Sequence, residues 1–249
     1  MTLKLPKIIG HRGACGYAPE NTIESIRTAA EIGAQWIELD VKLTRDNVPI
    51  IFHDDTLERT TNGFGNVADM DYEDLQQLEA GSWYGDSFAV TKIPTLEDAL
   101  EEIINLGLGL NLELKPCPGR EKETAEIALD ELSRIWDDHD RLLISSLQHP
   151  CLEIAHDMAT DWHRGLLLRH EDMPENWKDL ADYLEVSTIN ISDELASREF
   201  IEEIIDFEKP VLVYTVNDPI RARQLQSWGV DGFFSDVPDV IAENLLTVH

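Results

Sequence analysis

The stretch Gln35-Trp36-Ile37-Glu38-Leu39-Asp40 joins a short apolar run to two carboxylates that stand two residues apart. An apolar run of this length predicts a β-strand, and the spacing places Glu38 and Asp40 on the same face of that strand. The segment before it has a helical pattern that begins near Asn21, the expected N-cap, and ends near Gly33. The stretch therefore marks one strand of a chain in which strands and helices alternate.

Seven further short apolar runs alternate with helical segments along the chain. Eight strands alternating with helices over 249 residues are typical of a (β/α)₈ TIM barrel, an α/β fold. A doubly wound open sheet is the alternative, but no Gly-rich phosphate loop follows any of these strands. We therefore predict one barrel domain over residues 1–249, with strands at residues 7–10, 35–40, 109–114, 142–146, 164–168, 186–191, 211–215 and 231–235.

Residues 48–53 form a ninth apolar run, which follows Asp40 too closely to be a parallel neighbour of the second strand. We predict that this run returns antiparallel, as the second arm of a hairpin with its turn at Asp46-Asn47. Such a register pairs residues whose numbers sum to about 93, which places His53 opposite Asp40. The hairpin would thus carry His53 back to the mouth of the barrel.

The stretch after this hairpin has little repeat pattern until a helix whose expected N-cap is Thr95, with Asp98 three residues later. Long irregular segments inside compact domains are usually functional. We therefore predict that residues 41–95 form the hairpin plus a small insertion over the barrel mouth. The aromatic side chains of the insertion are candidates for a substrate pocket, with packing inside the insertion as the alternative reading: Trp83, Tyr84 and Phe88.

The net charge of −29 argues against nucleic acid and against anionic lipid as partners, because both are bound through clustered Lys and Arg. A phosphate site in such an acidic protein must carry positive charge of its own. We find no secretory signal and no membrane-spanning apolar run, and the three cysteines have no metal-type spacing. We therefore expect a cytoplasmic protein with reduced thiols; its oligomeric state stays open.

The active sites of barrel enzymes lie at the C-terminal ends of the strands. Three carboxylates gathered there cannot all stay ionised without a cation, and oxygen ligands favour a hard ion, Mg²⁺ or Ca²⁺. Histidines are suited to acid–base chemistry near neutral pH, and Arg and Lys to binding phosphate. We therefore predict His11 and His53 for acid–base chemistry, Glu38, Asp40 and Glu113 for one divalent cation, and Arg12 and Lys115 for a phosphate.

Seven motifs in order along the chain are His11-Arg12-Gly13, Pro19-Glu20-Asn21-Thr22, Glu38-Leu39-Asp40, His53-Asp54-Asp55-Thr56-Leu57-Glu58-Arg59-Thr60-Thr61-Asn62-Gly63, Asn111-Leu112-Glu113-Leu114-Lys115, Tyr214-Thr215-Val216-Asn217 and Gly229-Val230-Asp231-Gly232-Phe233-Phe234-Ser235-Asp236. Together they resemble the glycerophosphodiester phosphodiesterase family. The bacterial cytoplasmic branch of that family is the most similar in two segments, Gly81-Ser82-Trp83-Tyr84 and Leu212-Val213-Tyr214-Thr215-Val216-Asn217. The resemblance covers nearly the whole chain. It implies a barrel with a small insertion and the same seven residues in the same roles. Tyr214 stands where many members have Trp, so we add it to the candidates for the substrate pocket.

The resemblance implies metal-dependent hydrolysis of a glycerophosphodiester to sn-glycerol 3-phosphate and an alcohol. The nucleophile is either water or the glycerol 2-hydroxyl acting through a cyclic phosphate, and both routes stay open. One alternative is a barrel that acts on another phosphodiester lipid, such as an inositol or sphingoid lipid. The other is a protein that binds glycerol phosphate without turning it over. The preferred alcohol group and the choice between Mg²⁺ and Ca²⁺ are not decided by the sequence.

Overall fold

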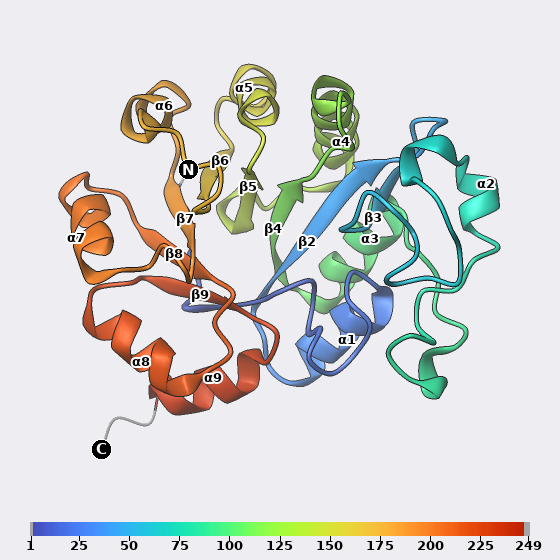
Figure 1. Ribbon diagram of the computed structural model, residues 1–249, viewed down its shortest axis with the longest axis horizontal. Helices are drawn as coiled ribbons and strands as arrows, with labels where there is room; N and C mark the ends of the chain where they lie inside the picture. Colours follow the sequence, from blue (N-terminus) through green and yellow to red (C-terminus); the bar gives the residue numbers. More distant parts are fainter. Residues whose placement is uncertain (1, 247–249) are drawn as a thin grey trace.

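Eight parallel strands close into a ring in the computed structural model, which describes residues 2–246 (Figure 1). The ring closes because β1 pairs with β2 on one side and with β9 on the other. This confirms the predicted (β/α)₈ barrel. Of the strands among residues 2–246, only β3 lies outside the ring. The strands are β1 (Ile8–Gly10), β2 (Trp36–Leu43), β3 (Pro49–Ile51), β4 (Gly109–Leu114), β5 (Leu142–Ser146), β6 (His163–Leu168), β7 (Thr188–Ser192), β8 (Val211–Tyr214) and β9 (Gly232–Ser235).

Helices surround the ring on its outer side (Figure 1). The apolar faces of these helices pack against the strands in two large clusters of buried side chains, one for each half of the barrel. The described α-helices are α1 (Ile23–Glu31), α2 (Tyr72–Leu75), α3 (Leu96–Leu106), α4 (Glu121–Ile135), α5 (His149–Met158), α6 (Trp177–Tyr183), α7 (Arg198–Asp206), α8 (Pro219–Ser227) and α9 (Pro238–Leu246), and short 3₁₀ turns cover Val67–Asp69, Asp86–Phe88 and His139–Arg141.

Two predicted helix starts have different outcomes. Thr95 caps α3 as predicted, since its side chain accepts from the amide of Asp98 and the Asp98 side chain accepts in return. The prediction of Asn21 as the N-cap of α1 is wrong. Thr22 caps that helix together with Ser25, because Asn21 has a left-handed φ of 56° and uses its side chain elsewhere.

The hairpin after β2 is confirmed, but its predicted register is wrong by one residue. Strand β3 runs antiparallel to β2, with Lys42 opposite Ile50, so paired numbers sum to 92. The difference arises in the turn, where Thr44 pairs with Val48 and three residues lie between them. The last of these, Asn47, has a left-handed φ of 66°, which suits the three-residue turn of this class. His53 therefore lies one position beyond the residue opposite Asp40.

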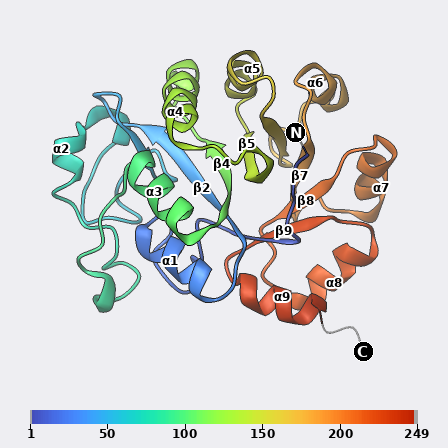
Figure 2. The same cartoon turned by 180° about the vertical axis from the view of Figure 1, so that it is seen from behind.

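The ring has a closed end and an open end. The chain before β1 crosses the end where the strands begin (Figure 2), and Leu3 and Leu5 pack there against an apolar cluster that includes Trp36 and Phe234. Polar and charged side chains gather at the other end, where the strands finish. The predicted site residues Glu38, Asp40 and Glu113 lie at this end.

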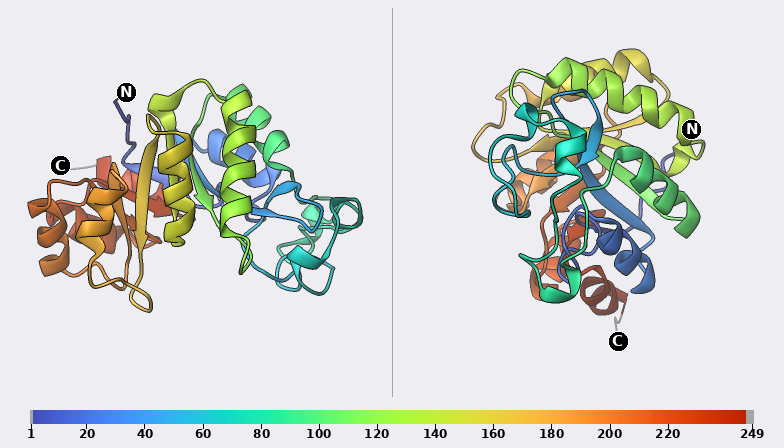
Figure 3. Two further views of the ribbon diagram at one scale, coloured as in Figure 1. Left: turned by 90° about the horizontal axis from the view of Figure 1, so that it is seen from above. Right: turned by 90° about the vertical axis from the view of Figure 1, so that its right-hand side faces the viewer.

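The segment after β3 builds a small unit beside the ring, on the side of β2 and β3 (Figure 3). It has an apolar cluster of its own, which includes Phe52, Leu57 and Leu75. Lys42 ties its base to the barrel: the fully buried ammonium group donates to the Asp54 carbonyl at 2.6 Å and lies 3.0 Å from the Asp55 carboxylate. This anchoring gives the segment after β3 a defined position beside the mouth.

Candidate active site

Three carboxylates meet at the mouth where β2 and β4 end. Glu38 and Asp40 point to the same side of β2, and Glu113 lies directly beside Asp40 in the register of β4. Carboxylate oxygens of the three residues lie within 4.8 Å of one another. Glu38 and Asp40 are almost completely buried. The structure thus brings together the three acids that we predicted as metal ligands.

These carboxylates differ in their electrostatic surroundings. Burial, followed by repulsion from Asp40 and Glu113, raises the pKa of Glu38 well above its usual range. Burial also acts to raise the pKa of Asp40, but the positive charges of Lys115 and Arg12 outweigh it and the pKa is lowered. One buried oxygen of Glu38, Oε1, has no hydrogen-bond partner among the described residues. A buried acceptor without a donor beside two further carboxylates fits a bound cation.

Two basic side chains lie against the same carboxylates. The ammonium group of Lys115 lies 2.9 Å from Glu113 and 3.7 Å from Asp40. The Nε atom of Arg12 lies 3.5 Å from Asp40, and the Arg12 backbone amide donates to Glu38 at 2.9 Å. Both predicted phosphate-binding residues are therefore at the mouth. They place local positive charge at the mouth of a protein with a net charge of −29.

Asn21 is a site residue that the sequence analysis missed. Its side-chain amide donates to Asp40 at 2.8 Å, and its carbonyl oxygen accepts from the Asp40 backbone amide at 3.2 Å. The left-handed backbone of Asn21 turns the side chain inward. The Pro19-Glu20-Asn21-Thr22 motif of the family resemblance could have indicated that Asn21 belongs to the site. The helix-capping pattern instead led us to predict Asn21 as an N-cap.

Each predicted catalytic histidine is held by an aspartate through Nδ1. His11 lies 2.7 Å from Asp236, and His53 lies 2.6 Å from Asp54. Nε2 of neither ring has a hydrogen-bond partner among residues 2–246, and Nε2 of His11 lies 3.9 Å from Glu38. Asp236 is itself held by the Asn217 side chain, which donates at 2.6 Å. The contact between Asp236 and His11 was not predicted from the sequence.

Arg59 links the histidine of the hairpin, His53, to Arg12. It donates to Asp54 at 2.6 and 2.8 Å and to Glu20 at 2.7 Å through each terminal nitrogen. Glu20 also accepts from Arg12 at 2.7 Å. A continuous chain of contacts, one hydrogen bond from His53 to Asp54 and then ion pairs through Arg59 and Glu20, therefore runs from His53 to Arg12. No role for Arg59 or Glu20 was predicted from the sequence alone.

The aromatic candidates divide into two groups. Tyr214 borders the small cavity at the mouth, and its hydroxyl donates to the Leu168 carbonyl at 3.1 Å. Trp83, Tyr84 and Phe88 stack edge to face on one another, with ring centres 5.6 and 5.5 Å apart, and do not line this cavity. The cavity is lined by His11, Glu38, Asn111, Glu113, Ser145, Leu167, Tyr214 and Phe234.

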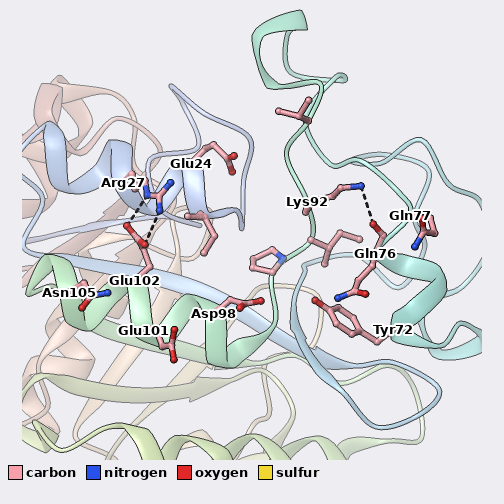
Figure 4. A pocket seen from close by; sticks show the side chains of 14 residues that line it. Glu24, Arg27, Tyr72, Gln76, Gln77, Lys92, Asp98, Glu101, Glu102 and Asn105 are labelled. Carbon is pink, nitrogen blue, oxygen red and sulfur yellow. Dashed lines mark hydrogen bonds and ion pairs between the residues drawn. The ribbon is translucent and has the colours of Figure 1, made fainter.

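A wider groove of about 650 Å³ lies on the outside of the barrel, between α1, α3 and the insertion (Figure 4). Its basic side chains are already engaged: Arg27 binds both oxygens of Glu102 at 2.8 and 3.0 Å, and Lys92 donates to the carbonyls of Gln76 and Leu78. Neither His11 nor His53 lines this groove, and none of the three clustered carboxylates does. We therefore place the active site at the mouth, although the cavity there is smaller.

Comparison with known proteins identifies the family. The sequence profile of the Glycerophosphoryl diester phosphodiesterase family matches residues 11–240. YhdW of Bacillus subtilis (strain 168) is 37% identical over 245 residues, which cover 95% of this chain and 97% of YhdW. The glycerophosphodiester phosphodiesterase of Caldanaerobacter subterraneus subsp. tengcongensis is 33% identical and covers 94% of this chain and 95% of its own length.

A solved structure with the same fold is that of an Oleispira antarctica phosphodiesterase in complex with its product sn-glycerol-3-phosphate. The two chains superpose with a TM-score of 0.93 at 38% identity, over 97% of each. Among residues 2–246, no helix has the length and apolar character needed to cross a bilayer.

Proposed function

The chain belongs to the glycerophosphoryl diester phosphodiesterase family, and on that premise we propose that it hydrolyses a glycerophosphodiester to sn-glycerol 3-phosphate and an alcohol, with one divalent cation bound. The observation that carries the proposal is the convergence at one mouth of three carboxylates, two histidines that aspartates hold, and the basic side chains of Arg12 and Lys115. The product named for the Oleispira antarctica relative supports the choice of product.

Glu38, Asp40 and Glu113 would hold the cation. The free Oε1 atom of Glu38 and the all-oxygen donor set support a hard ion, Mg²⁺ or Ca²⁺. When bound, such an ion supplies positive charge to the non-bridging phosphate oxygens as negative charge builds in the transition state.

Arg12 and Lys115 bind and orient the phosphate from the protein side. Arg12 suits this role because its guanidinium can donate two hydrogen bonds in a fixed plane, while Lys115 acts as a point charge. Both side chains are now paired with carboxylates, at 2.7 Å from Glu20 for Arg12 and 2.9 Å from Glu113 for Lys115. These ion pairs hold the two basic side chains at the mouth before the phosphate binds.

His11 and His53 move the protons through their Nε2 atoms. One ring takes the proton of the nucleophile, which is water or the glycerol 2-hydroxyl, and the other gives a proton to the departing alcohol. Asp236 and Asp54 accept at Nδ1 and thereby hold each ring in place. In each ring, Nδ1 therefore orients the side chain and Nε2 transfers the proton.

We extend the proposal to the edge of the site. Residues 1–249 act as a single phosphodiesterase domain, and residues 41–95, the hairpin and insertion, border the substrate because they carry His53 and Arg59. Tyr214 is our candidate for contact with the substrate, since it borders the cavity. Trp83, Tyr84 and Phe88 are better explained by packing on one another. The net charge of −29 supports a small-molecule substrate over nucleic acid.

The test is release of sn-glycerol 3-phosphate from a panel of soluble glycerophosphodiesters with different alcohol groups, run beside intact phosphodiester lipids. We expect turnover of at least one soluble substrate and loss of turnover in His11→Ala and His53→Ala. Turnover of intact lipids alone would favour the alternative of a barrel that acts on another phosphodiester lipid. Binding of glycerol phosphate with no turnover of any diester would favour a binding protein and contradict the proposal.

A further inference from the structure

A second group of side chains that could bind a metal ion includes His11 and is distinct from the three carboxylates. It consists of His11 and Cys15 in the loop after β1 and Asp236 after β9. The Asp236 carboxylate lies 2.7 Å from His11 Nδ1 and 2.9 Å from the Cys15 sulfur, and the sulfur lies 4.0 Å from the same imidazole nitrogen. All three residues are partly exposed.

The loop that carries the group is docked firmly onto Asp236. The backbone amide of Gly16 donates to the Asp236 carbonyl at 2.9 Å. A Cβ atom on Gly16 would come within 2.6 Å of that oxygen, so the close approach depends on glycine. The three donor atoms are therefore brought together by the backbone.

The donor set of this group differs from that of the carboxylate site. It offers one imidazole nitrogen, one thiol sulfur and one carboxylate oxygen, which is the chemistry that Zn²⁺ prefers, whereas Mg²⁺ and Ca²⁺ prefer oxygen alone. Zinc bonds of about 2.0–2.3 Å at tetrahedral angles would separate such ligand atoms by roughly 3.3–3.6 Å. The observed separations of 2.7, 2.9 and 4.0 Å bracket this range, so sub-ångström shifts would suffice.

We propose that His11, Cys15 and Asp236 form an inhibitory site for a thiophilic divalent cation such as Zn²⁺. Binding would release the Cys15 thiol proton to solvent and place a metal–sulfur bond in its stead. The lone pair of His11 Nδ1 would bind the ion, the ring proton would reside on Nε2, and the hydrogen bond to Asp236 would be lost. Solvent water would complete the coordination.

The consequence for activity rests on the proposed function of His11. An imidazole with a metal on Nδ1 keeps its Nε2 proton, and near neutral pH it neither accepts a second proton nor releases the first readily. The ring therefore stops serving as an acid–base group while the carboxylate site stays free for Mg²⁺ or Ca²⁺. Occupation of the group by zinc would switch the enzyme off without displacing its activating ion.

The test uses the intact protein, a non-thiol reductant and saturating Mg²⁺ or Ca²⁺. Co²⁺ serves as a coloured substitute for Zn²⁺, since a cobalt–thiolate bond adds charge-transfer absorption in the near ultraviolet. We expect this band in the parent and in the control Cys117→Ala, whose parent thiol is buried away from the group, and no band in Cys15→Ala. Zinc inhibition, normalised to the zinc-free rate of each variant, should require at least tenfold more zinc in Cys15→Ala than in the parent.

The proposal is overturned if the parent shows no thiolate band, if the band survives in Cys15→Ala, or if both proteins have the same zinc sensitivity. Equal sensitivity would mean that zinc acts at the carboxylates. The cobalt band does not depend on turnover, so a protein that binds cobalt through Cys15 but hydrolyses no diester would contradict the proposed function and leave the metal site standing.

Discussion

The guanidinium of Arg59 binds both carboxylate oxygens of Glu20, each at 2.7 Å. The same guanidinium holds Asp54, the partner of His53, while Glu20 holds Arg12. A single side chain from the insertion thus restrains a proposed proton-transfer residue and a proposed phosphate-binding residue together. Arg59 itself is a positioning residue, because it acts on both through carboxylates.

We expect Arg59→Gln to lower kcat by about 10²-fold, since misplacement of reacting groups by about 1 Å has effects of this size. Stability should change little, because the Arg59 side chain is 44% exposed and exposed ion pairs contribute about 0–1 kcal/mol. The measurements are kcat and KM together with thermal unfolding. Arg45→Gln is the matched control, because Arg45 makes a similar two-point pair with Asp71 away from the histidines. Equal kcat values in the two variants would remove the positioning role.

We expect His11→Ala and His53→Ala each to lower kcat by about 10²–10⁴-fold, the usual contribution of a general acid or base. Binding of Mg²⁺ or Ca²⁺, measured by calorimetry, should persist in both variants because neither ring is a proposed ligand at the three carboxylates. His156→Ala is the control, since His156 pairs with Asp157 on the outside of the barrel. Near-parent turnover in both His11→Ala and His53→Ala with cation bound would refute the acid–base assignment.

The ring of strands follows from the sequence because each strand is a short apolar run separated from the next by a helix. The hairpin could be inferred from the short spacing between β2 and β3. Its register could not, because the left-handed conformation of Asn47 adds one residue to the turn, and two turn lengths suit the same residues. A single backbone angle therefore decides which residue faces Asp40.

The meeting of the three carboxylates was predictable because alternation along β2 and β4 fixes which side chains share a face. The partners that hold them were not. His11 and Asp236 are 225 residues apart, and Arg59 and Glu20 are 39 apart. Such pairs depend on how loops from different strands approach one another, which periodicity does not encode. Asn21 was missed because its residue type equally suits a helix cap.

The pH dependence of turnover should report on His53. Burial and the positive charges of Arg12 and Lys115 lower the pKa of His53, and the opposing effect of Asp40 does not restore it. The neutral ring therefore persists below the ordinary histidine pKa of about 6.5. We expect the acid limb of kcat/KM, measured with the cation saturating at every pH, to lie below that value. An acid limb above it would show that another group controls proton uptake.

Removal of one buried charge should stabilise the protein when no cation is bound. The pKa of Glu38 is raised, so its ionised form destabilises the fold above the unfolded pKa of the carboxyl, and this cost vanishes as the pH falls. We expect Glu38→Gln to raise the free energy of unfolding near pH 7 by about 1 kcal/mol, or Tm by roughly 2–4 °C. The gain should shrink at acid pH and when Mg²⁺ is added to both proteins.

Thermal unfolding with chelator present measures the effect of Glu38→Gln. Glu31→Gln is the control for loss of one negative charge, because Glu31 is exposed at the end of α1. The same Tm shift in both variants would attribute the gain to net charge rather than to the buried carboxylate.

The central claim is that the three clustered carboxylates hold a divalent cation on which hydrolysis depends. The most direct test measures release of sn-glycerol 3-phosphate from a soluble glycerophosphodiester after thorough chelation and after Mg²⁺ or Ca²⁺ is restored, for the parent and for Glu113→Gln. We predict that chelation abolishes turnover, that at least one of the two ions restores it in the parent, and that Glu113→Gln needs a higher ion concentration. Turnover that survives chelation unchanged would contradict the account.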